Sequence, residues 1–205
     1  MESLTKLQQE VWEDSQVAEL GYWAGLVETD GEQGRCEQYL DLIKDYLGDT
    51  SDKILVDVGS GPRGILKLLK FKKGIAIDPL MEAYQEKGYS LKNINFIPIQ
   101  GTSEQIPLVS EYADVVFSIN MLDHAQDVIK SLNEMYRILK KDGILFLICD
   151  LRESAEQTDK YHKMYFSRET IISWVEKNNL LLQVENLMDS LSMEGLKSLM
   201  MVLCK

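Results

Sequence analysis

Residues 54–69 read Ile-Leu-Val-Asp-Val-Gly-Ser-Gly-Pro-Arg-Gly-Ile-Leu-Lys-Leu-Leu. The β-branched and apolar run 54–58 is typical of a buried parallel strand, and the apolar spacing of the second half predicts a helix. The turn between them fits G-x-G-x-x-G through Gly59, Gly61 and Gly64, small residues that let the backbone turn sharply and approach a ligand. The stretch therefore predicts a strand, a glycine loop and a helix, an arrangement that binds nucleotide-like ligands.

Two carboxylates narrow the choice of ligand. Asp57 precedes the first glycine by two residues, at the end of the strand, so its charge faces whatever the loop holds. It would repel a pyrophosphate but attract an ammonium group, by several kcal/mol at about 4 Å in an effective dielectric near 20. Pro62 removes one amide that a phosphate could have used. Asp78 ends a second apolar run about 20 residues downstream, where a carboxylate accepts hydrogen bonds from ribose hydroxyls. We expect a nucleoside that carries a cation.

The segments Asp-Val-Gly-Ser-Gly-Pro (57–62) and Ile-Ala-Ile-Asp-Pro (75–79) resemble the class I S-adenosylmethionine-dependent methyltransferases of the type 11 kind. Later segments extend the resemblance from about Lys53 to the C-terminus. It implies an α/β, Rossmann-like, doubly wound fold with a seven-stranded sheet in the order 3-2-1-4-5-7-6, the last strand antiparallel. It also implies S-adenosylmethionine as the cofactor.

The expected cofactor contacts follow from these motifs and from two later segments. Residues 101–104 resemble the family segment beside the adenine, with Ser103 or Glu104 near its exocyclic amine. The strand predicted over 113–119 ends at a tip that lies over the cofactor in the family. The complete set of cofactor-binding candidates is Asp57, Gly59, Ser60, Gly61, Asp78, Pro79, Thr102, Ser103, Glu104, Asn120 and Met121.

Two positions near the later strands carry specific expectations. Asp123 is either a pocket residue or the N-cap of a helix over about 125–139. Gly143 lies in the turn before a strand predicted over 144–150, and it is expected to adopt a conformation that other residues avoid.

Methyl transfer from a sulfonium needs a base only where the acceptor must lose a proton. His124 and His162 are the catalytic candidates, because an imidazole titrates near working pH; a structural or solvent-facing role is the alternative for each. Asp150 and Arg152 could bind a polar acceptor. No metal is expected, since the histidines stand 38 residues apart and lack a motif such as H-E-x-x-H.

The chain of 205 residues is expected to form a single methyltransferase domain, with residues 1–48 as an N-terminal helical lid and 49–205 as the Rossmann-like core. Tyr22 and Trp23 are the lid residues expected at the acceptor pocket. The alternative is that both N-terminal helices simply pack on the sheet edge.

Composition sets the expected partners and location. A formal net charge of −11 argues against a partner held by phosphate neutralisation. The Asn/Asp-Pro-Pro-aromatic tetrad of many nucleic-acid methyltransferases does not follow strand 113–119. We therefore expect a small-molecule substrate, no nucleic acid and no membrane, with the oligomeric state left open. Three widely spaced cysteines and the lack of a signal-like or membrane-spanning segment predict a cytoplasmic protein.

The sequence thus predicts an S-adenosylmethionine-dependent methyltransferase that acts on a small molecule or metabolite precursor. Two alternatives stay open. A non-catalytic protein that binds S-adenosylmethionine or S-adenosylhomocysteine would also lack a clear acid-base constellation. An NAD-dependent oxidoreductase would share the glycine loop, but its sheet would end in a parallel strand.

Overall fold

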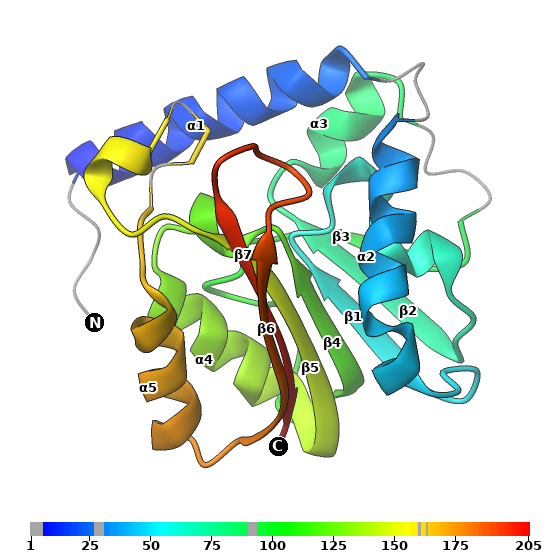
Figure 1. Cartoon of the computed structure of the whole chain (residues 1–205). Coiled ribbons are helices and arrows are strands. Elements are labelled where there is room, and N and C mark those ends of the chain that lie inside the picture. Colours follow the sequence, from blue (N-terminus) through cyan, green and yellow to red (C-terminus); the bar gives the residue numbers. More distant parts are fainter. Residues whose placement is uncertain (1–5, 27–30, 90–93, 160, 163) are drawn as a thin grey trace.

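The computed structural model describes residues 6–26, 31–89, 94–159, 161–162 and 164–205 (Figure 1). One seven-stranded sheet runs through the molecule in the order β3-β2-β1-β4-β5-β7-β6. All neighbours pair in parallel except β7, which is antiparallel to both β5 and β6. The predicted fold class, strand order and reversed last strand are confirmed. The strands are β1 Ile54–Val58, β2 Lys73–Asp78, β3 Ile97–Gln100, β4 Ala113–Ile119, β5 Leu139–Leu151, β6 Leu181–Asp189 and β7 Lys197–Cys204.

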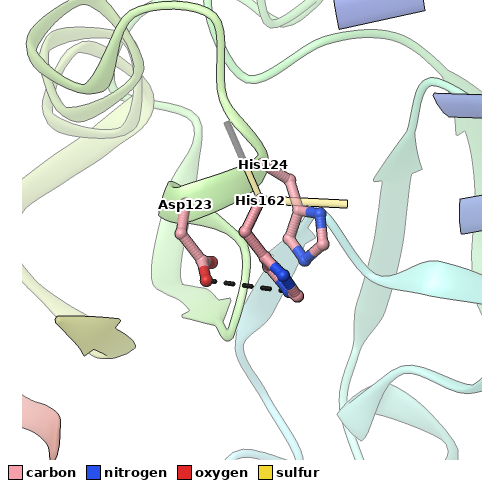
Figure 2. Close-up of side chains that lie close together, drawn as sticks. All are labelled: Asp123, His124 and His162. Atoms are coloured by element: carbon pink, nitrogen blue, oxygen red, sulfur yellow. Dashed lines mark ion pairs between the residues drawn. The ribbon is translucent and has the colours of Figure 1, made fainter. Parts of the chain in front are cut away.

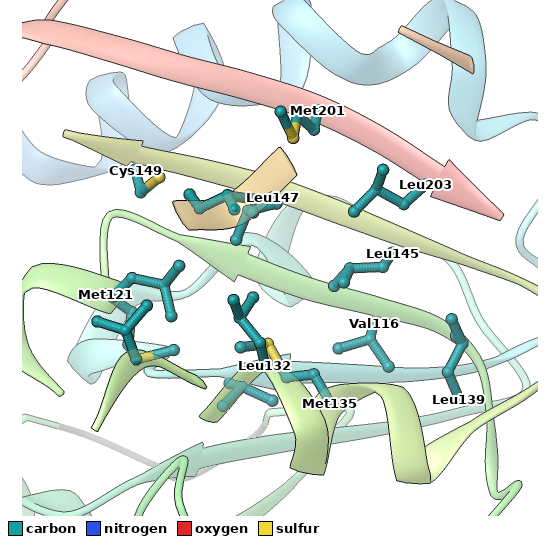
Figure 3. Close-up of a cluster of buried hydrophobic side chains, with 14 of the residues drawn as sticks. Val116, Met121, Leu132, Met135, Leu139, Leu145, Leu147, Cys149, Met201 and Leu203 are labelled. Carbon is teal, nitrogen blue, oxygen red and sulfur yellow. The ribbon is translucent and has the colours of Figure 1, made fainter. Parts of the chain in front are cut away.

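Alternation along the central strands builds a core on each face of the sheet, since successive side chains point to opposite faces. One face packs against helices α4 (Val128–Ile138) and α5 (Arg168–Lys177), as Figure 3 shows for the α4 contact. Val116 of β4 and Leu147 of β5 lie in that cluster with Leu132 of α4. The opposite face packs against helix α2 (Gly31–Leu47), where Phe117 and Phe146 stack at 5.5 Å between ring centroids. Because helices cover both faces, the sheet is most accessible to a ligand at the ends of its strands.

The N-terminal part lies across the carboxyl ends of the parallel strands. Helix α1 (Lys6–Ala24) crosses this edge at the top of Figure 1 and contacts the short helix α3 (Met81–Glu86). Both α1 and α2 belong to the predicted helical segment 1–48, of which residues 1–5 and 27–30 lie outside the described residues.

The prediction of a helix after the glycine loop is wrong. The chain instead makes two short 3-10 turns, η1 (Gly61–Arg63) and η2 (Ile65–Leu68). Gly64 separates them in an extended conformation, with φ −61° and ψ 166°. The amide of Ile65 donates to the Asp57 carboxylate at 3.1 Å, a bond that takes the place of helical pairing. The glycine loop therefore stays open around Asp57.

Two further local predictions need correction. Asp123 does not cap α4, because a 3-10 turn, η3 (Leu122–His124), follows β4 first and Asp127 takes the cap, accepting from the Lys130 amide at 2.9 Å. The unusual conformation predicted for Gly143 is instead adopted by its neighbour Asp142, which has a φ of 63°. Gly143 is required for space, since a Cβ there would lie 2.8 Å from Leu139.

Among the described residues, no helix combines the length and the apolar character needed to cross a membrane. No disulfide joins the cysteines among the described residues, and Cys149 is buried in β5.

Candidate functional site

A cavity of about 130 Å³ opens at the carboxyl ends of β1, β2 and β4. All eleven residues predicted to bind the cofactor line it, and so does His124. They come from segments far apart in the chain, which the parallel strands bring to one edge because such strands end on the same side of the sheet. Their assignment to particular parts of a ligand stays a prediction.

The glycine loop is shaped by close approach. Gly59 and Gly61 have φ of 72° and 56°, in the left-handed region that favours glycine. A Cβ on Gly59 would lie 1.9 Å from Cγ of Met121, so the tip of β4 closes directly onto the loop. The amide of Gly59 donates to the Ile77 carbonyl at 2.8 Å, which ties the loop to β2. Neither a larger residue nor a different backbone angle fits at Gly59.

Asp57 and Asp78 are buried carboxylates with few donors. Burial, together with the charge of Asp78, raises the pKa of Asp57 to about 7. Burial likewise raises the pKa of Asp78 to about 6, although it accepts from the amides of Leu80 (2.9 Å) and Gly61 (2.8 Å). Two carboxylates held this way would gain from a cationic ligand, because an opposite charge offsets part of the desolvation. An amino-acid ammonium group would supply that charge, and ribose hydroxyls would supply further hydrogen-bond donors to the carboxylates.

The segment expected beside the adenine uses its polar side chains within the protein. Glu104 accepts from the amides of Gln126 (2.5 Å) and Asp127 (3.3 Å), at the start of α4. Ser103 and Ser131 share a hydrogen bond of 2.8 Å between their hydroxyls. Both residues therefore fix the cavity wall onto α4, a role that their sequence context did not indicate.

A second cavity, of about 180 Å³, adjoins the first. It shares Glu19, Arg35, Asn120 and His124 with the cofactor cavity and is otherwise lined by Tyr22, Tyr161, His162, Ser192 and Met193. Asn120 stands at the boundary with φ 54°, an uncommon angle outside glycine. The first cavity is a candidate site for the cofactor. The second cavity, whose lining is partly aromatic, is a candidate site for another ligand.

The two predicted catalytic histidines meet at this boundary. His124 follows β4 and His162 comes from the loop after β5, yet their ring centroids are 4.4 Å apart. Nε2 of His162 lies 3.8 Å from Oδ2 of the fully buried Asp123, as Figure 2 shows. Its Nδ1 lies 2.9 Å from Asp159, and Nδ1 of His124 lies 4.0 Å from Glu19. Burial and then the neighbouring His124 lower the pKa of His162.

Asp150 and Arg152 do not belong to the lining of either cavity among the described residues. Asp150 accepts from the hydroxyls of Ser190, Ser192 and Ser198, which ties the β6–β7 loop to the end of β5. Arg152 is fully buried, with Nε 3.4 Å from Oδ2 of Asp123. The structure does not place them where they could bind an acceptor directly, because both side chains are buried outside the linings of the two cavities.

Several lining residues were missed by sequence reasoning. Glu19, Arg35 and Tyr39 of the two N-terminal helices line the cofactor cavity, and Ser192 and Met193 line the second cavity. Of the N-terminal segment, only Tyr22 and Trp23 were predicted to lie at a pocket. No local motif marks the polar residues that tertiary packing turns toward the cavity.

The strand order, the reversed last strand and the glycine loop with two buried carboxylates define a Rossmann-like, S-adenosylmethionine-dependent methyltransferase domain. Comparison agrees, since residues 56–147 match the family model described as a methyltransferase domain. S-adenosylmethionine is the cofactor of this class. The sheet of an NAD-dependent oxidoreductase was expected to end in a parallel strand, whereas β7 of this sheet is antiparallel to both of its neighbours.

Relatives and solved structures extend this result. A tRNA U34 carboxymethyltransferase of Campylobacter lari is 29% identical over 112 residues, which are 52% of this chain and 38% of that protein. One of Campylobacter jejuni subsp. doylei is 29% identical over 152 residues, 66% of this chain and 52% of that protein. A SAM-dependent methyltransferase structure from Thermotoga maritima has a TM-score of 0.65 at 21% identity, covering 95% of this chain and all of that chain. The chain spans about half the length, or less, of these curated relatives.

The relatives contradict the prediction about the partners of this protein. A small-molecule substrate and the exclusion of nucleic acid were predicted from the net charge and from the missing tetrad. Curated relatives named as tRNA-modifying enzymes contradict that prediction. The physical reason is that net charge describes the whole surface, whereas a base can enter a small pocket through contacts that involve few phosphates.

Proposed function

We propose that this chain transfers a methyl group from S-adenosylmethionine to a base of an RNA, with a tRNA uridine as the first acceptor to test. The observation that carries the proposal is the second cavity, which adjoins the cofactor cavity at Asn120 and His124. The names of the curated relatives supply the class of acceptor.

The second cavity has the lining that a flat base requires. The rings of Tyr22 and Tyr161 meet edge to face at 6.4 Å between centroids, and His162 meets Tyr161 in the same way at 6.1 Å, so a base would lie against an outer face of this aromatic cluster. Proteins that recognise unpaired RNA bases stack them on such rings and read their polar edges by hydrogen bonds. Asn120 and Ser192 would supply polar contacts on one side. The cofactor supplies an activated methyl group, so these residues mainly have to align the acceptor and exclude water.

Charge limits how the RNA would be held. With 22 basic and 33 acidic residues, the chain offers little net attraction to a phosphate backbone. Binding is therefore expected to depend on the base itself and to weaken only slightly with salt.

The test is transfer of radiolabel from methyl-labelled S-adenosylmethionine to unmodified tRNA, followed by nuclease digestion and separation of nucleosides. We expect label in a uridine derivative, with KM changing less than about tenfold between 50 and 200 mM salt. Tyr161→Ala should lower kcat/KM at least about tenfold through lost stacking, while affinity for S-adenosylhomocysteine changes little. Tyr165→Ala is the matched control, because that side chain is 53% exposed and does not appear in the lining of either cavity.

Label in no RNA fraction, with S-adenosylhomocysteine still bound, would contradict this function and favour a non-catalytic binding protein. Equal effects of the two tyrosine variants would contradict the assignment of the second cavity.

We also propose that the segment 1–48 acts as a lid on the core 49–205. Trp23 of α1 lies against the glycine loop, its ring 3.4 Å from where a Cβ of Gly61 would be. The indole donates to Glu19 at 2.7 Å, and Tyr89 donates to the Trp23 carbonyl at 2.6 Å. Rings of Tyr84 and Tyr89 meet it edge to face at 6.4 and 6.3 Å.

Trp23→Ala is expected to weaken binding of S-adenosylhomocysteine at least about tenfold, because it removes an aromatic wall from the cofactor cavity. Calorimetric titration measures this. Tyr46→Ala changes an exposed ring of α2 and should leave the affinity unaltered. The lid would be refuted by equal affinities in the wild type and the Trp23 variant.

A further inference from the structure

We propose that Asp123, His124 and His162 bind a divalent transition-metal ion at the boundary between the two cavities. The inference concerns the same site as the proposed function and depends on it only for the role of the ion. One potential ligand atom from each of the three residues lies within 4.8 Å of the others (Figure 2). These atoms come from two segments, η3 and the loop after β5, that the fold brings together.

The unsatisfied carboxylate of Asp123 is the observation that points to a ligand. Its side chain is fully buried, and neither carboxylate oxygen has a hydrogen-bond partner among the described residues. Its contacts are two longer ones, 3.4 Å to Nε of Arg152 and 3.8 Å to Nε2 of His162. A buried carboxylate normally accepts several hydrogen bonds, because burying an ionised group without them is costly. A bound cation would supply the missing interaction.

His162 is already oriented as a ligand. Its Nδ1 lies 2.9 Å from Asp159, and the amides of Tyr161 and His162 donate to the same carboxylate. A carboxylate that holds one imidazole nitrogen fixes the ring and directs the other nitrogen toward the metal. That other nitrogen, Nε2, faces Asp123. His124 has a carboxylate near its Nδ1 as well, Glu19 at 4.0 Å.

Charge in the cluster favours a dication. Glu19, Asp123 and Asp159 contribute three negative charges within ion-pair distance of the histidines or of Arg152, and Arg152 contributes one positive charge. Among these groups the negative charges outnumber the positive one, which favours a cationic ligand over an anionic one. Arg35 lines the adjoining cavity and would offset part of the charge of an anionic group there.

The ligand types determine which ion is expected. Two imidazoles and one carboxylate suit Zn²⁺, Co²⁺ or Fe²⁺ rather than Mg²⁺ or Ca²⁺, which prefer oxygen ligands. Three protein ligands leave a coordination position open, as in catalytic metal sites. Since His124 and His162 both line the second cavity, an acceptor oxygen or nitrogen could occupy that position and be held beside the cofactor cavity.

The experiment titrates the whole chain, stripped with a chelator, with Co²⁺ and with Zn²⁺, in the absence of cofactor and RNA. Calorimetry gives the stoichiometry, and visible absorption of Co²⁺ reports imidazole ligation. We expect one ion per chain, with affinity reduced at least tenfold in His162→Gln and in His124→Gln. Asp123→Asn is unsuitable alone, because it leaves the buried Arg152 without its counter-charge. Cys204→Ser removes a remote thiol and should leave the titration unchanged.

Folding of the histidine variants is checked by thermal melting and by titration with S-adenosylhomocysteine. The inference is overturned if the wild type shows no stoichiometric site, if both histidine variants bind as the wild type does, or if Cys204→Ser abolishes binding. Metal binding without label transfer to RNA would sink the proposed function and leave the metal site standing. The reverse result would remove the metal site alone.

Discussion

Replacing Arg152 by Met is expected to lower the free energy of unfolding by about 3–5 kcal/mol, among the largest effects of any single change in this chain. Arg152 is fully buried, and its Nε lies 3.4 Å from Asp123, which is fully buried too. Methionine fills much of the same volume but leaves Asp123 as an uncompensated buried charge. Urea denaturation of the ligand-free protein at neutral pH measures the loss.

The matched control removes both charges. Because the cost comes from the charge left behind, the double variant Asp123→Leu, Arg152→Met should recover at least about 2 kcal/mol relative to Arg152→Met alone. A single variant within about 1 kcal/mol of the wild type would show that the Asp123 charge is not left uncompensated when Arg152 is removed.

Replacing Asp57 by Asn should stabilise the ligand-free protein and weaken cofactor binding. Burial raises the pKa of Asp57 to about 7 in the folded chain, from 3.8 ordinarily. The folded protein therefore holds this proton more tightly than the unfolded chain, so wild-type stability falls as pH rises from about 4 to about 7. Above pH 7 the cost approaches an upper limit of about 4 kcal/mol, which the amide avoids.

The advantage of Asp57→Asn should grow by about 2 kcal/mol between pH 5.5 and pH 8 in urea denaturation. Its affinity for S-adenosylhomocysteine at pH 8 should fall about 10- to 100-fold, since a neutral amide loses the charged contact with the ligand's ammonium group. For Asp114, burial works to raise the pKa, but hydrogen bonds from Lys140 and the Ile54 amide outweigh it. Asp114→Asn should consequently destabilise, with unchanged affinity. A pH-independent difference for Asp57→Asn would contradict the assigned burial cost.

The sheet was predictable because its strands carry local signals. β4 has the predicted bounds, Ala113–Ile119, since a β-branched run between turns has no competing structure. The short closing loop between the last two strands required antiparallel pairing. The helix after the glycine loop was not predictable, because its apolar spacing is compatible with η2. The Ile65 amide instead bonds to Asp57, a tertiary contact that no local pattern indicates.

The candidate site, like the fold, has one part that the sequence predicts and one part that it does not. The eleven cofactor candidates line one cavity because each ends or follows a parallel strand, a relation that the chain order reveals. The cluster of Asp123, His124 and His162 has no such signal, since 38 residues separate the histidines and no spacing rule links the two loops. The exclusion of a nucleic-acid acceptor failed for another reason, as overall charge says little about a pocket of about 180 Å³.

A crystal structure with S-adenosylhomocysteine and a uridine nucleoside would show directly whether the two cavities hold the cofactor and the base. We expect the ammonium group at Asp57, the ribose at Asp78, and the sulfur at the boundary beside Asn120, with the base lying against the ring of Tyr161 in the second cavity. A sulfur directed away from Asn120 and His124, or a base bound outside the second cavity, would contradict this expectation.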